Sequence, residues 1–126
     1  ALQTLQFSDP GWTEDSQACH TRASTTIPGL AIMVESGWVT RIAIFDGRRV
    51  KTDNGIMLGS KGADVRAAYS PLRRETAPYK GEPDHELYFQ PEGREANGLR
   101  FSIDAKGIVE AIYAGGRSIE YMESCL

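Results

Sequence analysis

Histidines and carboxylates are the first residues of this chain that could do chemistry. His85 lies between Asp84 and Glu86. Neighbouring residues of a strand point to opposite faces, so these three side chains converge poorly on one ligand. The sequence contains no nucleophile elbow of the form G-x-S-x-G and no glycine-rich phosphate-binding motif. We therefore predict no catalytic residue, no metal ligand and no cofactor, and we expect a protein that is not an enzyme.

The two cysteines, Cys19 and Cys125, lie near opposite ends of the chain. Their separation excludes a CxxC redox or zinc motif, and leaves either one disulfide or two free thiols. We favour the disulfide, because chain ends otherwise fray, and closing a loop of about 100 residues contributes roughly 4–5 kcal/mol in the chain-entropy model. A structural disulfide indicates an oxidising compartment, so we expect a periplasmic or secreted protein. The start at Ala1, without a leader, is typical of a mature exported chain and also of an expression fragment.

The segment 72–84 holds the candidates for binding a partner. It contains Arg73, Arg74, Tyr79 and Lys80, and three prolines lie in or next to it. Arg and Tyr are enriched among the residues that dominate protein interfaces, and loops carry function more often than the elements they connect. We predict that these four residues contact a protein partner; an ordinary solvated loop is the alternative.

Composition limits the classes of protein to consider. The 126 residues are 40% hydrophobic and 25% charged, which is typical of one globular domain, 1–126, with its own core. The net charge of −3 disfavours a nucleic-acid partner, and no apolar run approaches the roughly 20 residues of a membrane helix. The charge is uneven, at −3 over residues 1–40, +5 over 41–80 and −5 over 81–126. Such a dipolar molecule steers its encounters with partners. The oligomeric state does not follow from the sequence.

The order of elements predicts an α+β fold. Alternation and β-branched residues predict strands at 30–34, 38–46, 85–90, 99–104 and 108–114, with 118–122 as a further edge strand. Ser60 as N-cap, an apolar face that includes Val65 and Tyr69, and Pro71 predict one short helix. We expect an antiparallel sheet of five or six strands with this helix packed on one face and the termini joined by the disulfide. Residues 1–28 are expected to be irregular and tied to the domain by Cys19.

Residues 59–71 carry a motif seen in a known family. Gly59, Ser60, Val65, Tyr69 and Pro71 have the spacing of the helix motif of BamE-like outer-membrane lipoproteins, and residues 55–114 resemble that family and the β-lactamase-inhibitor-protein-like fold. Ser70 stands where that family usually has glycine, the hairpin at 30–46 precedes the helix, and no lipobox cysteine begins the chain. The chain also resembles a group of small exported bacterial proteins of uncharacterised function. That second resemblance implies export and the disulfide, but no activity.

These observations together predict a non-catalytic, exported protein-binding module. We expect an inhibitor or immunity protein against an envelope-acting enzyme, such as a cell-wall hydrolase, with the 72–84 segment presented to the partner. One alternative is a BamE-like structural component of envelope assembly. Another is a small hydrolase or sugar-binding enzyme, which a pocket with two facing carboxylates, or a buried His85 paired with an acid, would favour.

Overall fold

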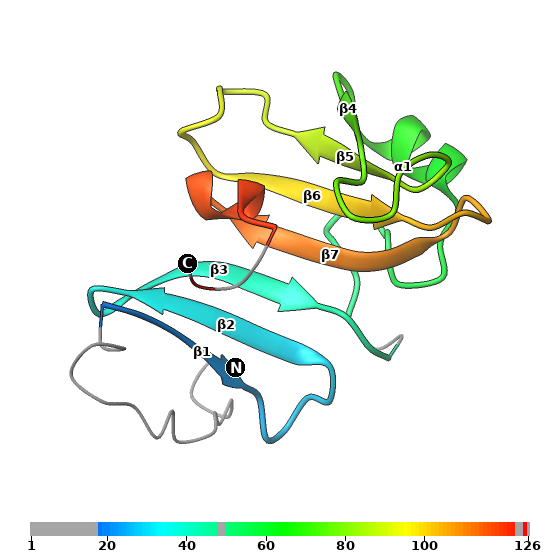
Figure 1. The fold of residues 1–126 in the computed structure, drawn as a ribbon. Coiled ribbons are helices and arrows are strands. Elements are labelled where there is room, and N and C mark those ends of the chain that lie inside the picture. The colour runs from blue at the N-terminus through cyan, green and yellow to red at the C-terminus, as the bar shows by residue number, and fades with distance from the viewer. Residues whose placement is uncertain (1–17, 48–49, 123–124, 126) are drawn as a thin grey trace.

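Seven antiparallel strands form one sheet in the order β1-β2-β3-β7-β6-β5-β4 (Figure 1). The structure is a computed structural model that describes residues 18–47, 50–122 and 125. In chain order its elements are β1 (Cys19–Ala23), β2 (Leu30–Glu35), β3 (Trp38–Ile44), α1 (Gly62–Ala68), β4 (Arg73–Thr76), β5 (His85–Phe89), β6 (Gly98–Ile103), β7 (Val109–Gly115) and the 3-10 helix η3 (Arg117–Glu120). Two meanders, β1-β2-β3 and β5-β6-β7, meet where β3 pairs with β7. None of the helices in these described ranges is long and apolar enough to cross a membrane.

The α+β class, the antiparallel sheet and, within the described residues, the single α-helix are confirmed, but the predicted five or six strands are wrong. β1 lies in the segment expected to be irregular, of which residues 1–17 are outside the described part, and β4 lies in the expected loop. Their sequences, CHTRA and RRET, carry little strand propensity, so pairing with β2 and β5 decides their conformation. The strand expected at 118–122 is replaced by η3.

The main core lies between one face of the sheet and α1. Val65 and Tyr69 point into it, as their spacing predicts, at 0% and 4% exposure. The Tyr69 ring lies 4.9 Å from Phe89 and 5.5 Å from Phe101, measured between centroids. The other buried members of this core come from the strands and from the segment before α1, and they are Leu30, Ile32, Ile44, Ile56, Leu58, Leu87, Ile103, Val109 and Ile112.

Ser60 does not cap α1, which is a correction to the sequence-based expectation. The N-cap is Lys61, and the Ser60 hydroxyl instead accepts the backbone N–H of Met57 at 3.1 Å. The Ser60 carbonyl accepts the N–H of Val109 at 2.8 Å, and Lys61 forms a bridge with Ile108. The backbone at these two residues is therefore engaged with the start of β7, and the helix begins only after it.

The second face of the sheet is also covered. Arg100 and Ser102 alternate with the core residues of β6, yet their exposures are 2% and 9%. The residues after β7 turn back over this face: η3 contacts β3, β6 and β7 (Figure 1). We call residues 116–122 the strap.

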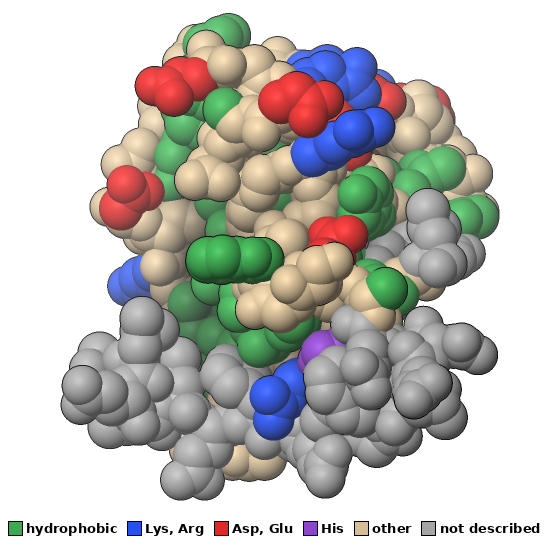
Figure 2. Space-filling model, turned by 90° about the vertical axis from the view of Figure 1, so that its left-hand side faces the viewer, with side chains coloured by type: hydrophobic (Ala, Val, Ile, Leu, Met, Phe, Trp, Pro, Cys, Tyr) green, Lys and Arg blue, Asp and Glu red, His purple; other side chains and the backbone are tan. Residues whose placement is uncertain are grey.

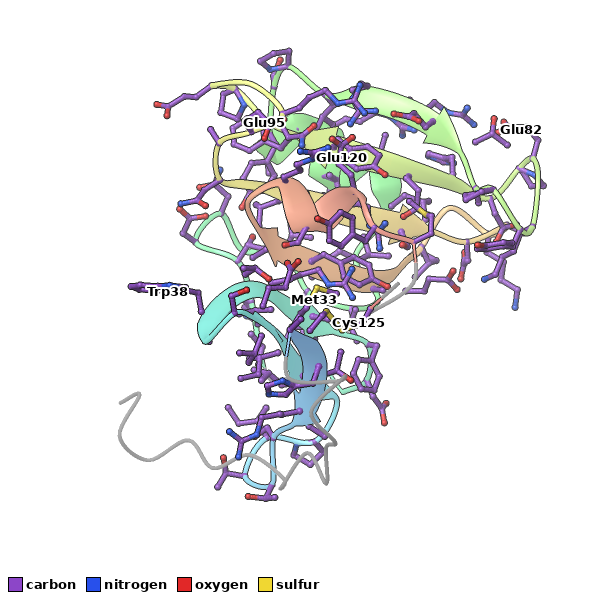
Figure 3. All side chains as sticks on the ribbon, turned by 60° about the vertical axis from the view of Figure 1, so that its left-hand side comes forward. Met33, Trp38, Glu82, Glu95, Glu120 and Cys125 are labelled. Carbon is purple, nitrogen blue, oxygen red and sulfur yellow. A yellow bond between two sulfur atoms is a disulfide. The ribbon has the colours of Figure 1, made fainter. Side chains whose placement is uncertain are left out.

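The disulfide joins the two distant parts of the chain as predicted. Cys19 and Cys125 are bonded, with an S–S distance of 2.12 Å and a Cα–Cα distance of 5.9 Å. Because Cys19 lies on the edge strand β1, the bridge ties the end of the strap region to one margin of the sheet (Figure 3).

Candidate functional site

The four predicted partner-binding residues lie on β4 and on the 77–84 loop that follows it. β4 is an edge strand: its only strand neighbour within the described ranges is β5. Three of its four residues are exposed, as is usual for a charged edge that resists unwanted pairing. The loop is fixed at its base, because the Ala77 N–H donates to Asp84 and the Gly81 N–H donates to Ala77.

Two of the predicted basic residues are engaged in exposed ion pairs. Arg74 donates to both carboxylate oxygens of Glu82, at 2.5 and 3.3 Å. The Lys80 ammonium lies 2.7 Å from Glu110 and 3.7 Å from Asp84, and the bond to Glu110 raises the pKa of Lys80. Exposed pairs of this kind contribute little to stability, so they orient the loop more than they hold the fold.

Tyr79 is the side chain of this region that is best placed to meet a partner. It is 77% exposed, and it lies between the anchored residues Ala77 and Gly81. Tyrosine offers a large amphipathic contact area with only two rotatable side-chain bonds, which keeps its entropy cost on binding low. The structure thus brings Arg74, Tyr79 and Lys80 onto one loop and strand edge.

Arg73 belongs elsewhere, although it is the neighbour of Arg74. Adjacent strand residues point to opposite faces, and the Arg73 side chain lies on the sheet face that the strap covers. Its guanidinium lies 4.0 Å from the centroid of the Tyr88 ring and donates to Glu120 at 2.7 Å. It also forms an ion pair with Glu75. The contacts of Arg73 are therefore those of a structural residue, and its role in partner binding stays a prediction.

Arg73 is one end of a row of alternating arginine and tyrosine side chains that crosses five strands. We call this the arginine–tyrosine row, and its members from β4 to β3 are Arg73, Tyr88, Arg100, Tyr113 and Arg41. The two arginines beside Tyr113 lie 3.8 Å and 5.1 Å from its ring centroid. Burial, and then repulsion between these two arginines, lowers the pKa of Arg41. Stacking on rings is a recognised way to hold a guanidinium away from water.

Beside the row lies a cavity of about 260 Å³ that contains two facing carboxylates. Glu75 and Glu86 are direct cross-strand partners, and both line this cavity. Glu86 is 6% exposed and accepts a 2.6 Å hydrogen bond from Ser102. Burial is the largest influence on Glu86 and raises its pKa, although Ser102 and Arg100 act against it.

The histidine candidate does not form an acid–base pair. His85 is buried at 8% exposure, and its Nδ1 lies 3.0 Å from the Pro83 carbonyl while its Nε2 lies 3.3 Å from Arg66. Neither partner is a carboxylate. Among the residues whose placement is described, no group of three or more His, Cys, Asp or Glu side chains could hold a metal ion.

Sequence reasoning missed an exposed apolar patch at the start of β3. Trp38, Val39 and Ile42 are 77%, 57% and 41% exposed, and the last two line a cavity of about 570 Å³. Trp38 points away from the ribbon in Figure 3, and Figure 2 shows hydrophobic side chains exposed on this side of the molecule. The apolar run WVTRIAIF carries the signal, but by itself it predicts only a strand.

No family model, no curated protein and no solved structure matches this chain.

Proposed function

We propose that the protein is an exported, non-catalytic module that binds another protein through the 77–84 loop and the open edge of β4. The observation that carries this proposal is the 77% exposure of Tyr79 on a loop with hydrogen bonds across its base. A loop that is already ordered loses little conformational entropy on binding. The disulfide supports export, because such bridges persist in oxidising compartments.

Within this class, we propose an inhibitor or immunity protein that blocks an envelope-acting enzyme such as a cell-wall hydrolase. Tyr79 would enter the cleft of the enzyme, while Arg74 and Lys80 flank it. Both cations are half-exposed and paired with Glu82 and Glu110, so an acidic cleft could take over either cation at small cost. The mechanism is steric occlusion and needs no chemical step on this chain.

The test is affinity capture from an envelope extract, followed by purification of the captured protein and titration with variants. Y79A and the double variant R74A/K80A should each weaken binding at least tenfold, the loss of a typical interface hot spot being about 2 kcal/mol. R117A is the matched control, because Arg117 is an exposed arginine on η3 with only a 3.9 Å contact to Glu95. If the wild type, Y79A and R74A/K80A bind the captured protein with equal affinity, the proposal for this loop is wrong.

The facing carboxylates favour a second candidate, a small hydrolase or sugar-binding protein. Glycoside hydrolysis requires two neighbouring carboxyl groups, one of which is an acid with a raised pKa. Here Glu86 is the buried acid, and Glu75 is ion-paired with Arg73. Glu86 would donate the proton and Glu75 would act as nucleophile or base.

This second candidate is tested with E86Q and E75Q on soluble peptidoglycan fragments and chitooligosaccharides. Hydrolysis by the wild type that both variants abolish would support it. Wild-type protein that neither binds nor cleaves these sugars would exclude it for this class of substrate.

A further inference from the structure

The strap provides an acceptor for every arginine of the arginine–tyrosine row. The Tyr121 carbonyl accepts from Arg41 at 2.9 Å and from Arg100 at 3.3 Å. The Ser118 carbonyl accepts a longer bond from Arg41, at 3.4 Å. The Glu120 carboxylate accepts from Arg73 at 2.7 Å. These bonds come in addition to the carboxylates that the sheet itself places near Arg73 and Arg100, namely Glu75 and Glu86.

The strap is held by the kinds of contact that hold a peptide ligand. Its Ile119 is fully buried, and the Ser118 hydroxyl donates to the Thr40 carbonyl at 2.5 Å. The Glu120 carboxylate also accepts from Arg94, at 3.0 Å to each oxygen. One apolar anchor, backbone carbonyls and one carboxylate are thus the groups that this surface recognises. Arginine binds carboxylates and carbonyls especially well, because its donors form a fixed planar fork.

We propose that the arginine–tyrosine row is a binding surface for a short peptide that carries a carboxylate, and that the strap, which includes the 3-10 helix η3, occupies it as an internal ligand. The Cys19–Cys125 bridge is the latch that keeps the strap in place. The partner is identified by the chemistry of the strap, namely a segment with a carboxylate directly after an aliphatic side chain. This surface lies on the sheet face and is distinct from the loop around Tyr79.

The latch opens by thiol–disulfide exchange. Both cysteines are partly exposed, so a thiolate can reach them. A dithiol reductant supplies two electrons and two protons: the bond between the two sulfurs breaks, Cys19 and Cys125 become thiols, and the reductant becomes a disulfide. An open latch makes the strap an intramolecular ligand that an external peptide can displace.

The probe is a fluorescein-labelled peptide with the sequence of residues 116–122, GRSIEYM, added to the full chain. The chain reduced with dithiothreitol, or carrying C19S/C125S, should bind this peptide, whereas the oxidised wild type should bind it at least tenfold more weakly. A matched peptide carrying E120Q should bind the reduced chain about tenfold more weakly, because it loses the charge-assisted bonds to Arg73 and Arg94.

Hydrogen exchange distinguishes a disulfide that holds only the strap in place from one that stabilises the whole sheet. Reduction should speed exchange at residues 117–122 while the amides of β5, β6 and β7 keep their protection. In the oxidised chain, E120Q alone should also speed strap exchange. Loss of protection throughout the sheet on reduction would overturn the proposal, as would equal peptide binding by the oxidised and reduced chains. These outcomes do not depend on Tyr79. Failure of the proposal for the 77–84 loop can therefore be distinguished from failure of the proposal for the strap.

Discussion

Arg100 and Tyr113 face each other across β6 and β7, and the guanidinium carbon lies 3.8 Å from the ring centroid. Arg100 is 2% exposed, yet it lies among groups that match its charge. It approaches Glu86 at 3.4 Å, and its Nη1 donates to the Tyr121 carbonyl and lies 3.5 Å from the Met122 sulfur. These neighbouring groups compensate the burial of the Arg100 charge, which would destabilise this sheet face without them.

We expect Arg100→Met to lower the free energy of unfolding by about 3 kcal/mol. Its removal leaves Glu86 buried without its nearest cation, and removing one partner of a buried pair typically costs about 3–5 kcal/mol. Urea denaturation measures the change. Lys106→Met, at an exposed turn residue, is the control and should be within about 0.5 kcal/mol of the wild type. Similar effects of both substitutions would show that the stack carries no stability.

The adjacent residues Arg73 and Arg74 should differ sharply in their effect on stability. Arg73→Ala removes a stack on Tyr88 and a bond to Glu120, and should cost about 1–2 kcal/mol. Arg74→Ala removes only an exposed pair with Glu82, and should cost under about 0.5 kcal/mol. Thermal unfolding of the two variants side by side makes the comparison. The opposite order would contradict the assignment of Arg73 to the covered face.

Glu86 and Glu120 should give pH dependences of opposite sign. Burial raises the pKa of Glu86 above the ordinary value of about 4.3, so the folded state binds its proton more tightly than the unfolded chain does. Its contribution to stability is therefore full below that ordinary value, and is lost as the pH rises through the folded pKa. Glu120 accepts bonds from Arg94 and Arg73 that lower its pKa, so its contribution is present above the ordinary value and is lost as the pH falls.

The measurement is the difference in unfolding free energy between the wild type and E86Q, and between the wild type and E120Q, from pH 3 to pH 8. The advantage of the wild type over E86Q should shrink as the pH rises, whereas its advantage over E120Q should grow. A rising difference for E86Q would mean that Arg100 and Ser102, rather than burial, control this carboxyl group.

Two glycines with the same backbone conformation provide a test of close packing. Gly29 and Gly37 have φ values of +81° and +84°, so alanine suffers similar backbone strain at either position. A Cβ at Gly29 would lie 2.3 Å from the Asp46 carbonyl oxygen, whereas a Cβ at Gly37 would meet nothing within 4 Å. G29A should therefore be less stable than G37A by about 1–3 kcal/mol in chemical denaturation. Equal losses of stability in G29A and G37A would show that the chain segments at Gly29 and Asp46 can move apart freely.

The sequence predicts the fold best for those elements whose local residue pattern agrees with their burial. The alternation of Leu99, Phe101 and Ile103 placed β6, and the spacing of Val65 and Tyr69 identified the core face of α1. The pairing of Cys19 with Cys125 followed from there being only two cysteines near the chain ends.

The rest depends on contacts between residues far apart in the chain. Arg100 looks like a solvent-facing strand residue until the strap, some 20 residues later, covers it. β4 has little strand propensity of its own, and it is a strand because it pairs with β5. For the candidate site, the sequence predicts Tyr79 and its basic neighbours, and their role in binding stays a prediction. The facing pair Glu75 and Glu86 was missed, because the sequence separation of these two residues carries no motif.

The disulfide also decides which part of the chain can carry mechanical load. Its two cysteines enclose a separation of 106 residues that contains every strand of the sheet. A force that pulls on the two chain ends passes from Cys19 to Cys125 through the sulfur–sulfur bond, so it bypasses the hydrogen bonds between strands. The fold is thus shielded from tension along its own chain for as long as that one covalent bond is intact.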